Sequence, residues 1–592
     1  MSLYRNANSH FAINPTINIK RSTFNRKFGI KTSFNAGLLI PLDWDEVLPG
    51  DTFSVDMSEV IRMSTPLYPI MDEIYLDTYF FFVPNRLLWK HWKEFNGENT
   101  TSKWEQETEY EIPQITAPTG GWAKGTIMDY LGIPTNKANL SVNHLPVRAY
   151  ALTWNEWFRD QNLQDPAYIS LEDATTAGSN GDNYVTDAIK GGKPLPVNKY
   201  HDYFTSALPE PQKGPNALLP IAESAPVIGN GKAINIYTNK SNPNDISPIM
   251  LASQNGTAVS PTENADFYPA NPLSFQNSRQ FLTIYGNSET PNPKQTAGET
   301  YNEPNSTSKF SVSNNSTLSI GLTKNPEYSG MIADLKSATA ININQLRQAF
   351  QIQKAFEKDA RGGTRYTEII YSHFGVTSPD SRQQRPEYLG GARVPININQ
   401  VVQTSSTDST SPQGNTAAYS LTGYRGNGFT KSFTEHGIVL TLVAIRTTHT
   451  YQQGIEKKWS RQRRFDYYWP VFANIGEQPI LNKEIYAQGT AVDNEAFGYQ
   501  EAWAEYRYKP NRVSGAMRSN ATQSLDAWHL ADNYSKLPTL GDEWIRETTA
   551  NIDRTLAVQS NQEDQFFGDF YFVNKTTRAM PLYSIPGLVD HH

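Results

Sequence analysis

Three short apolar runs, far apart in the chain, constrain the fold more than any other feature. They are Tyr79–Val83, Ile438–Ala444 and Gly568–Val573. Each is rich in aromatic or β-branched residues and has the length of a strand rather than of a helix. Around Phe53, Val55 and Met57, apolar and polar residues alternate, as in a strand with one buried face. Strand-like segments thus lie near both ends of the chain without a regular βαβ alternation, which predicts a mainly β core closed by distant segments.

Helical spacing of apolar residues is confined to three segments. It predicts helices over Arg86–Phe95, over Val147–Asp160, and from Ile343 to the glycine pair Gly362-Gly363, where a helix should end. The apolar faces expected in these helices are Leu88, Trp92 and Phe95; Ala151, Trp154 and Phe158; and Ile343, Leu346 and Phe350.

The sequence lacks the usual local signatures of catalysis and cofactor binding. There is no cysteine, which excludes disulfides, Cys-ligated zinc and a cysteine nucleophile. Gly423 and Gly428 have the spacing of a phosphate-binding loop, but Phe429-Thr430 follows where Lys-Ser/Thr is required. His436 and His449 flank an apolar strand and are interpreted as packed or turn residues. We therefore predict no enzyme, no cofactor and no metal site, although a Ser–His–Asp site built from distant residues stays open here.

No segment of the sequence resembles a membrane anchor. The most apolar stretch, Ile438–Ile445, is far shorter than the roughly 20 residues that a bilayer requires. The first twenty residues lack the apolar core of a signal peptide. We expect no membrane insertion.

Residues 1–42 form a basic N-terminal segment in a chain whose net charge is −7. This basic N-terminal arm contains no Asp or Glu and has no helical periodicity. The pattern predicts that the arm is extended and contacts nucleic-acid phosphates. Its phenylalanines would be available to stack on unpaired bases. A solvated tail is the alternative. The candidate phosphate contacts are Arg5, Lys20, Arg21, Arg26, Lys27 and Lys31, and the candidate stacking residues are Phe11, Phe24, Phe28 and Phe34.

A second basic and aromatic segment is Lys457–Trp469, KKWSRQRRFDYYW. Guanidinium groups beside aromatic rings suit single-stranded nucleic acid. Arg, Tyr and Trp are also enriched where protein subunits meet. An amphipathic strand or a subunit interface is the interpretation that we favour.

Residues 205–330 differ from the rest of the chain in composition. They contain 14 of the 37 prolines, are dense in Asn, carry few charges and show no long apolar period. Long irregular segments inside compact domains are commonly functional. We predict a large surface insertion between two parts of a core, 43–204 and 331–592.

Seven ordered blocks, spread over nearly the whole length, carry a family resemblance. They resemble the major capsid protein of the Microviridae, specifically the gokushovirus-type branch, and none is a catalytic motif. The blocks are FNAGLLIPLDWDEVLPGDTF (34–53), DTYFFFVPNRLLW (77–89), RQAFQIQKAFEKDARGGTRYTEII (347–370), SHFGVTSPDSRQQRPEYLGG (372–391), DYYWPVFANIGEQPILNKEIY (466–486), FGYQEAWAEYRYKPNRVSGAMRS (497–519) and MPLYSIPGLVDHH (580–592).

The resemblance implies an eight-stranded jelly-roll barrel with long, partly helical insertions between strands. It implies a virion of sixty copies in a T=1 icosahedral shell around circular single-stranded DNA, assembled in the bacterial cytoplasm. The 205–330 insertion would form the protrusion at the three-fold axes and face a bacterial surface receptor. An internal scaffolding protein and a pilot protein are the other implied partners. A β-sandwich carbohydrate-binding protein is the alternative, because jelly rolls also serve as lectins.

Overall fold

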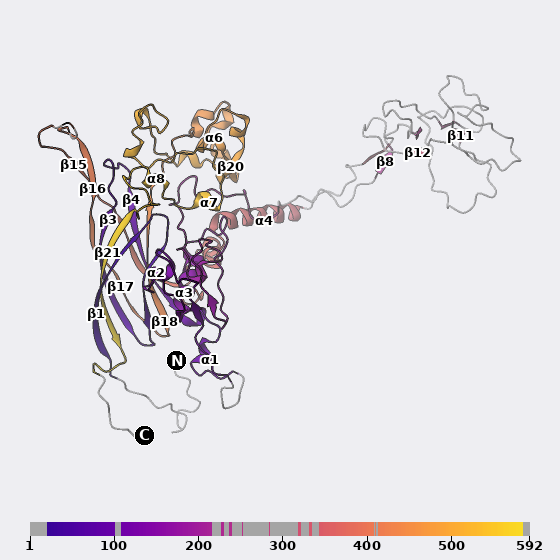
Figure 1. Cartoon of the computed structure of the whole chain (residues 1–592). Coiled ribbons are helices and arrows are strands. Elements are labelled where there is room, and N and C mark those ends of the chain that lie inside the picture. Colours follow the sequence, from indigo (N-terminus) through magenta and orange to yellow (C-terminus); the bar gives the residue numbers. More distant parts are fainter. Residues whose placement is uncertain are drawn as a thin grey trace. The chain divides into compact units, whose positions relative to one another are not determined.

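The computed structural model describes residues 20–100, 108–215, 343–407, 409 and 412–583, with the backbone of six short strands between 227 and 333. The chain divides into two compact units (Figure 1). The first unit is Met1–Pro215 with Lys354–His592, and the second unit is Asn216–Gln353. The second unit thus begins and ends at later residues than the 205–330 boundaries expected from composition.

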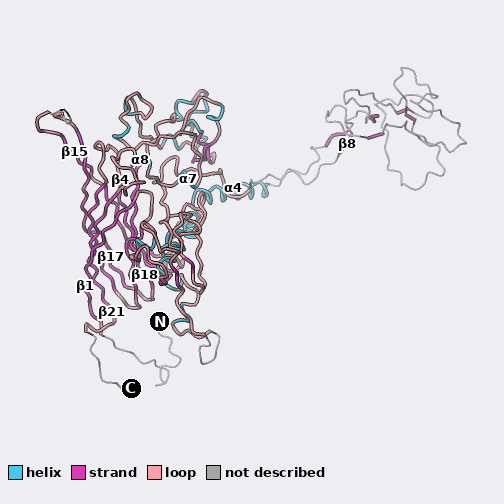
Figure 2. Tube along the Cα trace, in the orientation of Figure 1, coloured by secondary structure: helices cyan, strands magenta, loops and turns pink. Residues whose placement is uncertain are grey.

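Two four-stranded antiparallel sheets make up the centre of the first unit (Figure 2). Successive strands alternate between the sheets, except that β4 and β14 are neighbours in one sheet, which is the strand order of an eight-stranded jelly roll. The predicted jelly-roll fold is confirmed. The first sheet has the order β1 (Ser22–Phe34), β21 (Phe566–Arg578), β3 (Thr52–Met63), β17 (Thr422–Ser432). The second sheet has the order β14 (Glu387–Pro395), β4 (Ile74–Pro84), β18 (Gly437–Thr447), β2 (Ile40–Val47).

The four strands predicted from apolar patterns all lie in this jelly roll. β3 alternates buried and exposed positions as expected, and β4 and β18 are buried along nearly their whole length. β1 and β21, from opposite ends of the chain, pair antiparallel from Ser22 opposite Arg578 to Phe34 opposite Phe566. The core is therefore closed by distant segments, as the sequence predicted.

The two sheets differ in what covers their outer faces. Between the sheets lies a core that includes Phe53, Phe80 and Phe570. The far side of the second sheet is buried by a further cluster around Trp89 and Trp154, to which α3 (Leu145–Trp157) contributes. On the first sheet, the outward positions of β1, β21 and β3 are exposed or half-buried and mostly polar. The second sheet is thus covered on both faces, whereas the first sheet is covered on its inner face only.

The helix predictions have mixed outcomes. α3 is confirmed, with Ala151 and Trp154 buried, and ends at Trp157. The helix over Arg86–Phe95 is wrong: a 3-10 turn, η2 (Asn85–Leu87), is followed by the short α1 (Trp92–Phe95). The interruption falls at Leu88 and Trp89, both fully buried, where the Trp89 indole donates a 2.6 Å hydrogen bond to Asp173. This tertiary contact overrides the local helical spacing.

The third predicted helix has the expected end but not the expected burial. α4 runs from Ile343 to Gly362, and Gly363 follows with a φ of 96°. The side chains of Ile343 and Phe350 are 65% and 56% exposed, so the apolar face is not buried among the described residues.

Smaller elements complete the first unit. β19 and β20, with α6 and α7, surround a separate hydrophobic cluster that includes Phe204, Tyr451, Ile480 and Trp544. The helices are α2 (Ile127–Tyr130), α5 (Tyr366–Phe374), α6 (Asn482–Ile485), α7 (Asp542–Ile545) and α8 (Ala550–Asp553). The strands are β5 (Gln114–Thr116), β6 (Ser141–Asn143), β7 (Thr176–Ala177), β15 (Ile398–Val402), β16 (Thr416–Ser420), β19 (Glu477–Leu481) and β20 (Ala496–Glu501).

The second unit contains three nested antiparallel strand pairs. The outermost pair joins β8 (Val227–Gly229) to β13 (Met331–Ala333). Inside it, β9 (Ile236–Thr238) pairs with β12 (Leu318–Ile320), and β10 (Leu251–Ala252) pairs with β11 (Thr283–Ile284). Among the residues that the structure describes in both units, no helix has the length and apolarity that crossing a bilayer requires.

Candidate functional site

The basic residues predicted in the N-terminal arm lie on a sheet strand, and the strand separates them. β1 pairs with β21 along its whole length, so this part of the arm is built into the jelly roll. Side chains alternate between the two faces of a strand, so Lys27 and Lys31 point outward and are exposed. Arg26 points inward, forms an ion pair with Asp45 and hydrogen bonds to Thr576. Arg5 lies outside the described residues.

The cations of the arm also differ in their partners. Lys20 is exposed at the start of the strand. The Arg21 guanidinium donates a hydrogen bond to the Gly50 carbonyl. Lys31 forms an exposed ion pair with Asp569 at 3.5 Å. The structure therefore brings Lys27 and Lys31 to one face and turns Arg26 away from it, and phosphate contact by these residues stays a prediction.

The stacking role expected for the phenylalanines of the arm is wrong for Phe28 and Phe34, which pack inside the jelly roll. Phe28 points inward and stacks on Phe572, with ring centroids 4.9 Å apart. Phe24 is half-buried on the same side of β1, and Phe34 is fully buried. Phe11 lies outside the described residues. Alternation along the strand explains the result, because Phe24 and Phe28 share parity and both face the interior.

The segment Lys457–Trp469 forms a cluster of exposed rings held by arginines. It is not a strand: η4 (Lys457–Ser460) and η5 (Arg464–Asp466) are 3-10 turns, and η6 (Pro470–Phe472) follows. Trp459 is 73% exposed and Val471 is 81% exposed. We call this region the aromatic surface. Its exposed members are Trp459, Phe465, Tyr467, Tyr468, Trp469, Val471, Ile475 and Tyr506.

Two arginines hold the rings of the aromatic surface in place. The Arg461 guanidinium lies 4.2 Å from the ring centroid of Tyr506 and forms a 3.1 Å ion pair with Glu505. Arg464 lies over the Trp469 ring at 4.6 Å. Because Arg461 is already paired, it adds little free positive charge to the surface. Burying such rings against a partner would stabilise association, since Trp, Tyr and Arg dominate interface energetics.

A cavity of 940 Å³ opens beside the aromatic surface. Its lining includes Trp459, Tyr506 and Tyr508, together with Lys457 and Glu484. The Tyr203 hydroxyl donates a 3.1 Å hydrogen bond to Glu484 within it. Because the lining combines aromatic rings with groups of both charges, the cavity suits binding of a protein segment as well as binding of a small ligand.

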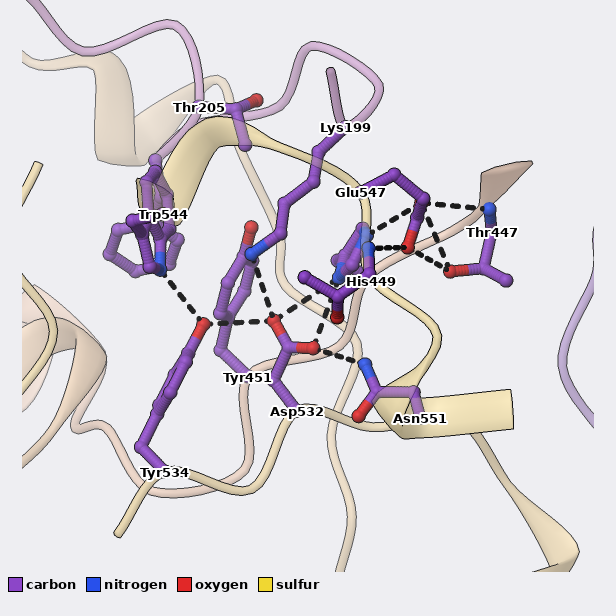
Figure 3. Close-up of polar contacts among 12 residues, drawn as sticks. Lys199, Thr205, Thr447, His449, Tyr451, Asp532, Tyr534, Trp544, Glu547 and Asn551 are labelled. Carbon is purple, nitrogen blue, oxygen red and sulfur yellow. Dashed lines mark hydrogen bonds and ion pairs between the residues drawn. The ribbon is translucent and has the colours of Figure 1, made fainter. Parts of the chain in front are cut away.

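In the first unit, a buried histidine lies between two carboxylates (Figure 3). His449 Nδ1 lies 3.1 Å from Asp532, and Nε2 lies 3.1 Å from Glu547. Lys199 Nζ is 3.7 Å from Asp532, and the Tyr534 hydroxyl donates to Asp532 at 2.8 Å. We call His449, Asp532, Glu547 and Lys199 the buried ion cluster.

The charges of this cluster balance one another. Burial alone lowers the pKa of His449, but the charges of Asp532 and Glu547 outweigh burial and raise it from 6.5 to about 10. Burial raises the pKa of Asp532, yet His449 and Lys199 hold it well below its usual range. Two cations therefore face two carboxylates away from solvent. These ion pairs join chain segments that are far apart in the sequence.

The sequence does not reveal the buried ion cluster. His449 is a packed residue beside the β18 strand, as predicted, but no carboxylate lies near it in the sequence. Asp532 and Glu547 are 83 and 98 residues away along the chain, so no local spacing signals the contact. Within the described part of the chain, no group of three or more His, Asp or Glu is arranged to hold a metal ion.

An eight-stranded jelly roll with a large exposed aromatic surface is the architecture of a shell-forming structural protein or of a lectin. Comparison with known proteins decides between the two. A family model described as Capsid protein (F protein) matches residues 12–588. The chain belongs to this family of phage capsid proteins, and its place is the virion.

Three relatives match over nearly the whole chain, and each is named Capsid protein VP1. The relative from Chlamydia phage 1 is 42% identical and covers 98% of both chains. The relative from Bdellovibrio phage phiMH2K is 43% identical over 99% of both chains. The relative from Spiroplasma virus 4 is 41% identical over 94% of this chain and 93% of its own. The resemblance to gokushovirus-type Microviridae is confirmed, and the carbohydrate-binding alternative is not favoured.

Proposed function

We propose that sixty copies of this chain assemble into a T=1 icosahedral shell around a circular single-stranded DNA genome. The observation that carries the proposal is the aromatic surface: eight large side chains stand exposed around residues 459–506 in a protein of a capsid family. Monomeric soluble proteins rarely expose a contiguous apolar patch of this kind unless it binds something. A neighbouring copy of the chain covers it in the shell.

The jelly roll supplies the rigid wall, and the inserted segments supply the contacts. Loops on a rigid scaffold commonly carry recognition. In this proposal the 205–330 insertion forms the protrusion at the three-fold axes and takes part in attachment to a bacterial surface receptor. An internal scaffolding protein and a pilot protein join during assembly in the host cytoplasm. The role is structural, and we assign no catalytic residue.

The aromatic surface is proposed as a contact between subunits rather than as a nucleic-acid site. Two of the five cations of Lys457–Trp469 are neutralised by carboxylates: Lys458 pairs with Glu456, and Arg461 pairs with Glu505. Nucleic acid binding depends on unpaired positive charge, whereas subunit interfaces tolerate and enrich paired arginine.

The test is electron microscopy with sedimentation on the full chain, expressed with and without its scaffolding protein. Uniform small icosahedral particles containing nuclease-protected circular single-stranded DNA would confirm the proposal. A stable monomer under every condition would overturn it. Shells of another triangulation number, or shells without DNA in the presence of the complete phage machinery, would overturn the corresponding part.

A further inference from the structure

The outer face of the first sheet is an exposed or half-exposed and mostly polar strand surface. Hydrogen-bonded register places its side chains in rows across four strands, for example Lys27, Val573, Asp56 and Gly428. We call it the outer sheet face. Its members are Thr23, Asn25, Lys27, Gly29 and Lys31 of β1; Phe567, Asp569, Tyr571, Val573, Lys575 and Thr577 of β21; Thr52, Ser54, Asp56, Ser58, Val60 and Arg62 of β3; and Arg425, Gly428, Thr430 and Ser432 of β17.

This face is basic although the chain as a whole is acidic. It carries five cations against two carboxylates, whereas the net charge of the chain is −7. One of the carboxylates, Asp569, is already beside Lys31. The cations come from strands far apart in the sequence, so only the sheet brings them together. They are Lys27, Lys31, Lys575, Arg62 and Arg425.

Small hydroxyl side chains fill much of the space between the cations. Thr52 hydrogen bonds to Ser432 at 2.8 Å, and Thr430 donates to Ser54 at 3.0 Å. Thr23 and Thr577 form a third such pair at 2.8 Å. Hydroxyls and cations together are the groups that proteins use on the phosphates and sugars of nucleic acids. The low relief of such a face suits an extended chain laid across it.

One aromatic ring stands in the middle of this face with small neighbours on both sides. Tyr571 is 46% exposed and lies between Gly29 on β1 and Ser58 on β3. Gly29 has no side chain to cover the ring, and a Cβ atom built there would lie 3.8 Å from Tyr571 Cδ2. Lys27 and Lys31 flank Gly29, about 13 Å apart along the strand. A ring between two cations is the arrangement that stacks an unpaired base while its phosphates are neutralised.

We propose that single-stranded nucleic acid binds along the outer sheet face, with its phosphates on Lys27, Lys575 and Arg62 and a base stacked on Tyr571. The inference rests on the proposed function, in which the shell encloses single-stranded DNA. It assigns that contact to the outer face of the first sheet, including two cations outside the N-terminal arm, Arg62 and Lys575. A second copy of the chain is the competing occupant. The face offers such a partner four large side chains that are apolar or aromatic, Val60, Phe567, Tyr571 and Val573, and Phe567 and Val573 are half-buried. Its other members are small, polar or charged, which favours nucleic acid.

The first experiment is photo-crosslinking in assembled, DNA-filled particles, with mass spectrometry to locate the crosslinked peptides. Crosslinks on β1, β21 and β3, including Tyr571, would support the inference. Crosslinks confined to other segments would overturn it and leave the proposed function intact. Particles that hold no DNA would overturn the proposed function itself, so the two failures are distinguishable.

The second experiment measures binding of a fluorescent oligo(dT) to the full-length, unassembled chain. Lys27→Gln/Arg62→Gln/Lys575→Gln should weaken binding at least tenfold, and the slope of log affinity against log salt should become less negative by about 2. The matched control, Lys93→Gln/Lys137→Gln/Lys536→Gln, removes the same charge from exposed positions elsewhere. Equal losses in both triple variants would show a non-specific charge effect and overturn the inference.

The tyrosine variants separate stacking from charge. Tyr571→Leu should weaken oligo(dT) binding about tenfold, and Tyr571→Phe should bind like the unchanged protein. Equal binding by both variants would overturn the stacking contact. A failure of the triple variant to form shells, with its oligo(dT) affinity unchanged, would identify the face as a subunit contact and overturn the inference.

Discussion

His449 and Asp532 lie 3.1 Å apart in the interior of the protein, with side chains only 2% and 6% exposed. His449 follows β18, and Asp532 belongs to the C-terminal loops that precede β21. Glu547 contacts the opposite ring nitrogen and also accepts a 3.0 Å hydrogen bond from the Thr447 backbone amide. The histidine therefore ties the end of one sheet strand to two later segments.

We expect His449→Gln to lower the free energy of unfolding by about 3–5 kcal/mol, because it leaves two buried carboxylates facing one lysine. Urea denaturation of the unassembled full chain measures the effect. His201→Gln, at an exposed histidine, is the control and should unfold at the same urea concentration as the unchanged protein. Equal midpoints for the two variants would contradict a stabilising role of the buried ion cluster.

The same histidine predicts a pH dependence of stability. Burial lowers the pKa of His449, but Asp532 and Glu547 raise it further, from 6.5 to about 10. Lys199 is the other cation beside Asp532. Because the pKa is higher in the folded state, protonated His449 contributes its full stabilisation below pH 6.5. This stabilisation is lost as pH rises through about 10. Between these values the unchanged protein should therefore lose more stability than His449→Gln. Parallel curves for the two proteins would refute the assignment.

At Glu59 on β3 we expect a substitution to stabilise the protein, whereas substitution of His449 destabilises it. Its carboxylate is buried in the jelly roll, neither oxygen has a hydrogen-bond partner there, and burial raises its pKa from 4.5 to about 7. Its contribution to stability is present below pH 4.5 and is lost as pH rises through about 7. Glu59→Met should therefore stabilise the protein at pH 8, by up to about 3 kcal/mol, and much less at pH 4.5. Urea midpoints at both pH values test this, and a destabilised variant at pH 8 would contradict it.

Two glycines on β17 offer a matched test of strand packing. A Cβ atom at Gly428 would lie 1.9 Å from the Val55 carbonyl oxygen, whereas one at Gly423 meets nothing within 4 Å. Gly428→Ala should cost about 1–3 kcal/mol or more, because β17 must move away from β3. Gly423→Ala should be close to neutral. Thermal unfolding of both variants provides the comparison, and equal melting temperatures would contradict the packing seen here.

The aromatic surface predicts an assembly defect without a folding defect. Trp459→Ser and Val471→Ser remove side chains that are largely exposed in the single chain, so the unassembled protein should unfold normally. If a neighbouring copy buries them, the yield of shells should fall at least tenfold, as for interface positions worth 2 kcal/mol or more. Tyr168→Ser, at an exposed ring that is not a member of the aromatic surface, is the control. Normal shell yields from both test variants would refute the contact.

Much of the fold was predictable because its strands are marked by local patterns. The run Tyr79–Val83 and the alternation of Phe53, Val55 and Met57 identify β4 and β3 without tertiary information. The helix over Arg86–Phe95 failed because Leu88 and Trp89 are buried by contacts that spacing does not reveal. Sequence patterns report the local period of burial, whereas a long-range contact can break an element whose period is correct.

The candidate sites divide in the same way. Residue order identifies the family, and the family resemblance implies the jelly-roll class. Residue charge gives the N-terminal arm its basic character. Only the tertiary structure decided that Arg26 turns inward while Lys27 faces outward, since strand pairing sets which parity is buried. It also decided that Lys27, Lys575 and Arg62 share one face and that His449 meets Asp532. Hydrogen-bonded register and packing place such residues together regardless of their separation along the chain.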